Sequence, residues 1–115
     1  MAADKNLWPG SAAVLVLKLL EERDMYGYEM IETLARRSDH TFDLKAGTLY
    51  PILHGLEREG ALTSCERRAA TDRTRKYYHL TEKGKRLLEE KQREWTVYAE
   101  AVNRILRGGV SYGAV

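Results

Sequence analysis

Residues 45–60 have the pattern of one short amphipathic helix, so the rest of the chain must cover its apolar side. That side consists of four residues at helical spacing: Leu49, Ile52, Leu53 and Leu56. Gly47 and Thr48 form a start signal, because the Thr48 hydroxyl can accept an N–H of the first turn. Gly60 is the expected end, since glycine readily adopts the left-handed conformation that terminates helices. We therefore expect one short helix between these two signals.

The other side of this helix is small, hydroxylated, aromatic and basic. It carries Thr48, Tyr50, Pro51, His54 and Arg58. Such a surface can enter a DNA major groove, where these side chains reach phosphates or base edges. The alternative is a core helix with an ordinary solvated face, and the helix taken alone favours this simpler interpretation.

Two predicted strands follow the helix and enclose a basic loop. Residues 61–67 and 75–80 have strand-like patterns, and residues 68–74 between them are polar and basic. From Glu66 to Lys76 there are five basic and two acidic residues. Helix, strand, basic loop and strand in this order predict a winged helix-turn-helix, with the loop as the wing. The local charge of the wing favours a nucleic acid as partner.

Four short motifs occur along the chain in a fixed order. They are Tyr26-Gly-Tyr-Glu29, Gly47-Thr-Leu-Tyr-Pro51, Leu56-Glu-Arg-Glu-Gly60 and the segment from Arg75 to Gly84. Together they resemble the PadR-type transcriptional regulators over residues 12–107. The resemblance implies a homodimer that binds double-stranded DNA and represses transcription. Gly55 stands where this family often has a basic residue, and residues 69–71 stand where its wing usually has glycines.

Further helices are predicted on both sides of this unit. Residues 11–22 are apolar on almost every side, which indicates a buried helix. Residues 28–37 form a second helix with one apolar face, and residues 82–107 form a long last helix with Thr81 as its cap. The expected fold class is therefore mostly α with a small β-hairpin, a winged helix-turn-helix followed by a long C-terminal helix.

The last helix is too long to be covered by a domain this small, and its apolar residues recur as a seam of coiled-coil type. The predicted dimer interface contains Leu88, Trp95, Tyr98, Val102 and Ile105. Two copies of Trp95 near a two-fold axis could hold a planar aromatic effector, and a plain packed interface is the simpler alternative. The chain thus divides into a DNA-binding domain at 11–80, a dimerisation helix at 81–107 and a flexible tail at 108–115.

Composition adds few constraints. The 115 residues fit a single domain, and the formal net charge is only +2. Cys65 is the only cysteine and is expected to be a half-buried strand residue, which predicts a reducing, cytoplasmic location. We recognise no leader segment and no apolar run long enough to cross a bilayer. The three histidines do not form metal-ligand spacing with Cys65, so no metal, cofactor or enzymatic activity is expected.

The predicted site combines the helix and the wing. The expected DNA contacts are Lys45, Thr48, Tyr50, His54, Arg58, Arg73, Arg75 and Lys76. Thr48, Tyr50 and His54 would lie in the major groove, while the cations would contact phosphates and fix the orientation. A protein-interaction module of the same fold without DNA is the alternative, and the basic wing argues against it.

Overall fold

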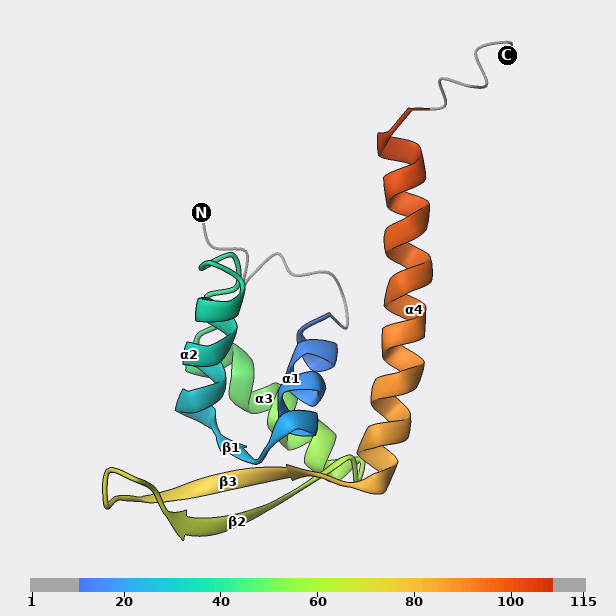
Figure 1. Cartoon of the computed structure of the whole chain (residues 1–115). Helices are drawn as coiled ribbons and strands as arrows, with labels where there is room; N and C mark the ends of the chain where they lie inside the picture. Colours follow the sequence, from blue (N-terminus) through green and yellow to red (C-terminus); the bar gives the residue numbers. More distant parts are fainter. Residues whose placement is uncertain (1–10, 109–115) are drawn as a thin grey trace.

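The computed structural model describes residues 11–108 of the chain. Its elements, in chain order, are α1 (Ser11–Glu22), β1 (Met25–Tyr26), α2 (Gly27–Arg37), α3 (Ala46–Arg58), β2 (Leu62–Arg68), β3 (Thr74–Leu80) and α4 (Glu82–Leu106). Helices α1, α2 and α3 lie on one side of a small sheet, and α4 rises away from it as a long helix (Figure 1). The predicted fold class, mostly α with a small hairpin and a long last helix, is confirmed.

The sheet is antiparallel with the strand order β1–β3–β2. Strands β2 and β3 pair along their whole length, from Leu62 opposite Leu80 to Arg68 opposite Thr74. Strand β1 has only two residues and pairs with the middle of β3, at Tyr77 and Tyr78. It was absent from the sequence prediction, because two residues are too few to show a period-2 pattern.

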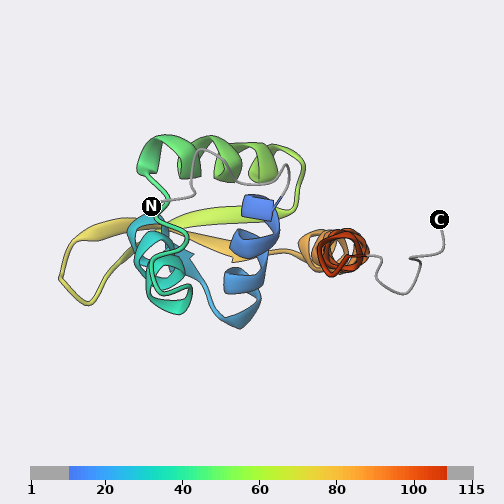
Figure 2. The ribbon, with the colours of Figure 1, turned by 90° about the horizontal axis from the view of Figure 1, so that it is seen from above.

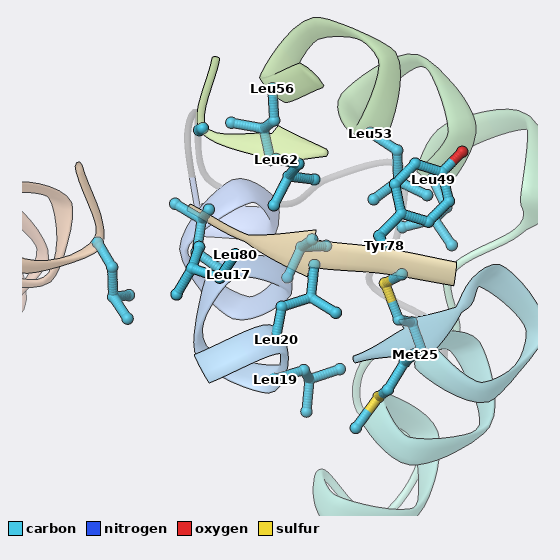
Figure 3. Packing of buried hydrophobic residues seen from close by; sticks show 14 of the residues in the cluster. Leu17, Leu19, Leu20, Met25, Leu49, Leu53, Leu56, Leu62, Tyr78 and Leu80 are labelled. Carbon is cyan, nitrogen blue, oxygen red and sulfur yellow. The ribbon is translucent and has the colours of Figure 1, made fainter. Parts of the chain in front are cut away.

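Alternation along the strands gives the sheet one apolar face. Leu62, Tyr78 and Leu80 are buried on the inner face, which packs against the helices. Figure 3 shows Leu49 and Leu53 of α3 above Tyr78, and Leu56 above Leu62. This confirms the predicted apolar side of α3.

The start of α3 differs from the prediction, whereas its end does not. Lys45 is the N-cap residue, and the N–H of Thr48 donates to the Lys45 carbonyl at 2.9 Å, so Thr48 already lies inside the first turn. Thr48 therefore does not cap the helix. Gly60 has a φ of +85°, the left-handed conformation expected just after a helix. The prediction for Thr81 is also confirmed, since its side chain accepts from the N–H of Gly84 at 3.0 Å.

The first turns of helix α4 pack in the domain core, and the rest of the helix extends beyond it. Its first turns complete the domain core, where Leu88 is only 1 % exposed and packs within the cluster of buried residues. The prediction that Leu88 lies in a dimer interface is therefore wrong: the apolar seam begins inside the domain and leaves it only further along the helix. None of the described helices is long and apolar enough to cross a membrane. The predicted tail lies outside the described residues except for Gly108.

Candidate nucleic-acid interface

The start of α3 and the loop of the hairpin lie at the same end of the molecule. The N-terminal end of α3 points toward this loop, and α4 stands at the opposite end (Figure 2). Tyr50, Pro51, His54 and Arg58 are exposed, and Thr48 is half-buried. The helix thus presents the predicted hydroxyl, aromatic and basic groups to solvent beside the wing, in the arrangement that a winged helix-turn-helix uses on a duplex.

Tyr50 is fixed by its neighbours as well as exposed. Its ring lies 6.3 Å from the ring of His54, centroid to centroid, on the next turn of α3. Its hydroxyl lies against Gly27, the buried first residue of α2, where an added Cβ would be 2.3 Å from the oxygen. Because Gly27 has no side chain, Tyr50 can reach across to the start of α2 and hold the two helices together.

The wing turn forms without glycine. Asp72 takes the left-handed conformation, with a φ of +67°, and Ala69 donates its N–H to the carbonyl of Arg73 at 2.8 Å. Arg68 forms an exposed ion pair with Asp72 at 3.1 Å. The side chain of Arg73 is exposed, and within residues 11–108 it has no carboxylate partner. Arg73 is therefore the cation at the tip that is available to a phosphate.

Arg75 and Lys76 lie on opposite faces of β3, as successive strand residues must. The Nζ atom of Lys76 is 5.6 Å from the centroid of the Tyr78 ring, on the inner face that also packs against α3. The guanidinium of Arg75 is 5.2 Å from the centroid of the Tyr26 ring, on the outer face. Lys76 therefore shares a side with α3, whereas Arg75 does not.

A hydrogen bond joins α3 to the wing directly. The hydroxyl of Ser64 on β2 donates to a carboxylate oxygen of Glu57 on α3 at 2.7 Å. Tyr78 lies beneath this junction, and burial, followed by the nearby Glu57 charge, raises the pKa of its hydroxyl above the ordinary value. The orientation of α3 relative to the hairpin is thus set by polar as well as apolar contacts.

Several residues of this arrangement were not found by the sequence prediction. Gly27, Glu57 and Ser64 were not assigned to the site, because their partners lie in other elements, although Gly27 and Glu57 fall within two of the four motifs. Cys65 is exposed on β2, so the prediction that it is half-buried is wrong. It lies on the outer face of the sheet, where no helix covers it. In the part of the chain that the structure describes, no group of three or more His, Cys, Asp or Glu could hold a metal ion.

The upper part of α4 exposes an apolar face. Trp95 and Tyr98 are 36 % and 46 % exposed, and their ring centroids are 5.6 Å apart. Ile105 is exposed, while Val102 is half-buried. Leu106 is exposed on the same face and was missed by the prediction, although it lies at helical spacing from Val102. Such a row of large apolar residues on a single helix can be buried only against another apolar surface.

Comparison with known proteins agrees with this architecture. Residues 16–90 match the transcriptional regulator PadR-like family. The transcriptional regulator Rv3488 of Mycobacterium tuberculosis is 33 % identical over 99 residues, which are 86 % of this chain and 85 % of that protein. Among solved structures, a PadR family transcriptional regulator from Eggerthella lenta is 36 % identical with a TM-score of 0.72. The similarity covers 87 % of this chain and 85 % of that one.

A PadR-like transcriptional regulator from Bacillus cereus is also similar in fold. It superposes with a TM-score of 0.74 and 28 % identity, and the match covers 86 % of this chain and 94 % of that one. The family match spans well over half of the sequence and includes both the recognition helix and the wing. This chain therefore belongs to the PadR-like family of transcriptional regulators, which bind DNA through a winged helix-turn-helix.

Proposed function

We propose that this chain is a homodimeric repressor that recognises a specific operator sequence and is released from it by a small-molecule or stress signal. The proposal rests on where the recognition elements and the last helix lie in the molecule. The N-terminal end of α3 and the loop of the wing lie at one end of the molecule, and α4 stands at the other (Figure 2). Residues 11–80 then bind DNA, and residues 81–107 hold two copies together.

The DNA contacts divide by chemistry. Thr48, Tyr50 and His54 face the major groove, where hydroxyl and imidazole groups can hydrogen-bond to base edges. Lys45 at the start of α3 and Arg58 near its end contact phosphates on the two sides of the groove.

The wing adds cationic contacts outside the groove. Arg73 at its tip and Lys76 on the side of α3 contact the backbone. Arg75 is assigned to the backbone as well, although it lies on the outer face, so its contact requires the duplex to reach the edge of the hairpin. These charged contacts supply affinity for any duplex, and the groove contacts of α3 add the preference for one sequence.

The second copy of this chain covers the apolar face of α4. The interface consists of Trp95, Tyr98, Val102 and Ile105, which follow one another at three- and four-residue steps, together with Leu106, four residues after Val102. Burial of these side chains against the same residues of a second copy removes apolar area from water at about 25 cal/mol per Å². A two-fold axis through α4 also places two recognition helices on one duplex, which suits an operator with two inverted half-sites.

The effector is proposed to be a planar aromatic molecule between the two copies of Trp95. Trp95 is more than one third exposed in a single chain, so its indole can stack either on Trp95 of a second copy or on a ligand. Flat rings that stack on indole gain dispersion and quadrupole attraction beyond the area buried. A ligand wedged there would change the distance between the two recognition helices, which gives a route from binding to release.

The DNA proposal can be tested with the duplex upstream of the chain's own gene. Fluorescence polarisation should show that His54→Ala weakens binding to this duplex by about ten- to hundredfold, the loss of one groove contact. Binding to a scrambled duplex should change less, because phosphate contacts remain. Arg104→Ala on α4, which removes a charge far from the wing, is the matched control. An equal loss on both duplexes would show that His54 does not recognise bases.

The effector proposal has its own readout. Planar aromatic compounds should quench tryptophan fluorescence saturably in the wild type, and Trp95→Ala should abolish this while sedimentation still shows a dimer. A dimer without saturable quenching across a panel of such compounds would leave a plain interface and refute the effector site. The repressor sign is tested by a reporter gene behind the upstream duplex, whose expression should rise when the chain is deleted.

A further inference from the structure

The outer half of the wing is a ribbon of two strands. Strand β1 pairs with β3 only at Tyr77 and Tyr78, so residues 66–68 and 74–76 have no third strand. In both views the hairpin loop projects past α2 and α3 (Figures 1 and 2). A two-stranded hairpin is marginally stable in water by itself. The direction of this ribbon therefore depends on contacts at its base.

A stack of two rings between two cations crosses that base on the outer face. The guanidinium of Arg67 on β2 is 4.3 Å from the centroid of the Tyr77 ring on β3. Tyr77 meets Tyr26 of β1 edge to face, with centroids 5.3 Å apart and ring planes at 74°. Arg75 follows, with its guanidinium over Tyr26 and its Nε atom buried without a hydrogen-bond partner. The stack thus joins all three strands of the sheet.

Asp24 fastens the same stack to the helical body. This residue lies in the turn between α1 and β1, and its carboxylate accepts a hydrogen bond from Arg67 at 2.5 Å. The Nδ1 atom of His79 on β3 lies 2.8 Å from its other oxygen. One carboxylate therefore contacts both long strands of the hairpin, and its fixed position in the turn between α1 and β1 holds them.

The register explains why the two arginines turn toward the base. Arg67 and Arg75 are direct partners across β2 and β3, and like charges in this position repel each other. The stack separates them, because Arg67 extends to Asp24 and Tyr77 while Arg75 extends to Tyr26. The charge of Arg67 is thereby held at the base of the ribbon by Asp24. A role of Arg67 in contacting DNA would require its side chain to point at the duplex, on the side where α3 lies.

We propose that Arg67 and Tyr77 are positioning residues that aim the wing at the duplex by fixing the base of the ribbon to the turn at Asp24. They act through Arg73, the exposed cation at the tip, and touch no DNA themselves. This rests on the proposed contact of Arg73 with a phosphate. This mechanism has a specific consequence. Removing the neutral ring of Tyr77, on the face opposite α3, should abolish the contact of Arg73 with a phosphate at the tip of the hairpin.

The test compares Tyr77→Leu with Tyr77→Phe by the salt dependence of DNA affinity. Tyr77→Phe keeps the ring under Arg67 and should match the wild type. Tyr77→Leu removes no charge, yet it should weaken binding several-fold and lower the log–log salt slope by about one, as Arg73→Ala does. Combining Tyr77→Leu with Arg73→Ala should lower the slope no further. A wild-type slope in Tyr77→Leu overturns the proposal.

Arg67→Lys separates positioning from direct contact. Lysine keeps the charge but loses the flat fork that stacks on Tyr77 and pairs with Asp24, so this variant should resemble Tyr77→Leu. A variant with wild-type affinity and slope would mean that only the charge matters, and the positioning role would fall. Circular dichroism and thermal melting establish that each variant is folded, and Arg67→Lys changes only an exposed side chain.

A measurement without DNA distinguishes this proposal from the proposed function. The N–H of Ala69 closes the wing turn onto the carbonyl of Arg73. Its hydrogen exchange should be faster in Tyr77→Leu than in Tyr77→Phe, while core amides of α1 exchange equally. If the exchange of this amide differs in this way but the wild type binds no duplex, the stack does orient the wing and the proposed DNA-binding function is wrong. Equal exchange in the two variants refutes the stack as a brace.

Discussion

The hydroxyl of Tyr50 on α3 lies so close to Gly27, the first residue of α2, that a Cβ at position 27 would stand 2.3 Å from it. The ring carbon that bears the hydroxyl would be 2.7 Å away. We predict that Gly27→Ala displaces the Tyr50 ring, and with it the neighbouring His54, from the side of α3 offered to DNA. Specific binding should weaken by about tenfold or more, the scale of one lost base contact.

A double-mutant cycle identifies the cause of this loss. Tyr50→Leu removes the hydroxyl oxygen and the two ring carbons that crowd position 27, so Gly27→Ala should have little further effect in that background. Polarisation titrations on a specific and a scrambled duplex measure the four affinities. If Gly27→Ala weakens binding equally with Tyr50 and with leucine at position 50, the effect comes from the backbone of α2 and not from the contact described here.

Gly55 offers a gain of function. An added Cβ would meet nothing closer than a guanidinium nitrogen of Arg58 at 3.9 Å, and Gly55 lies on the turns of α3 between Pro51 and Arg58. Gly55→Lys should tighten binding to every duplex and raise the salt slope by about one, because it adds a phosphate contact. Gly55→Ala is the matched control: it should stabilise the fold by about 0.5–1 kcal/mol and leave the slope unchanged.

The carboxylate of Asp24 makes stability depend on pH. Partial burial tends to raise its pKa, but hydrogen bonds from His79 and then Arg67 outweigh this and hold the pKa below the ordinary 3.8. A lowered pKa in the folded state stabilises the protein above pH 3.8, and this stabilisation fades as the pH falls through the folded value. Asp24→Asn should therefore lower the Tm at neutral pH by a few degrees.

The Tm values of the wild type and Asp24→Asn should converge at acid pH. Other carboxylates titrate equally in both, so the difference in Tm between wild type and Asp24→Asn isolates Asp24. Thermal melts followed by circular dichroism across acid pH should show this difference shrinking below pH 3.8. A difference that stays constant with pH would mean that shape or hydrogen bonding at position 24, and not its charge, stabilises the fold.

Helix α4 provides a matched pair for the dimer. Trp95 lies on the apolar face, whereas Val97, two residues on, points to the other side and is 63 % exposed. Trp95→Asp should shift the protein toward monomer in sedimentation, because an unpaired charge would be buried at the interface. Val97→Asp should remain a dimer. Dissociation by both variants alike would place the interface elsewhere on α4, and a monomeric wild type at micromolar concentration would remove it altogether.

The sequence predicted the elements that depend on local patterns. The apolar side of α3, the end of this helix at Gly60 and the cap at Thr81 all follow from periodicity and backbone chemistry within a few residues. The cap of α3 was misplaced by three residues, because the hydroxyl of Thr48 was a stronger local signal than the extended conformation of Lys45. Short-range signals place a helix more accurately than they place its ends.

Contacts between elements lay beyond the sequence. The spacing of Leu88 and Trp95 is the same whether a seam packs within one chain or between two, and only the fold shows that Leu88 is already buried. The face of the hairpin on which Arg75 lies depends on its register with β2. Asp24 gave no signal, since its partners follow it by 43 and 55 residues. Gly27 and Tyr50 are also far apart in the chain, so no local pattern reveals their contact.

The central claim is that α3 and the wing of two copies recognise one duplex sequence. Selection of the full chain against a pool of random duplexes, followed by titration of the enriched and scrambled sequences at one salt concentration, tests this directly. We predict an enriched site with two inverted half-sites about 34–36 Å apart or a multiple of that distance. Its affinity should exceed that of the scrambled duplex by about 10³-fold or more. A pool without enrichment, or equal affinities for the two duplexes, would contradict the account.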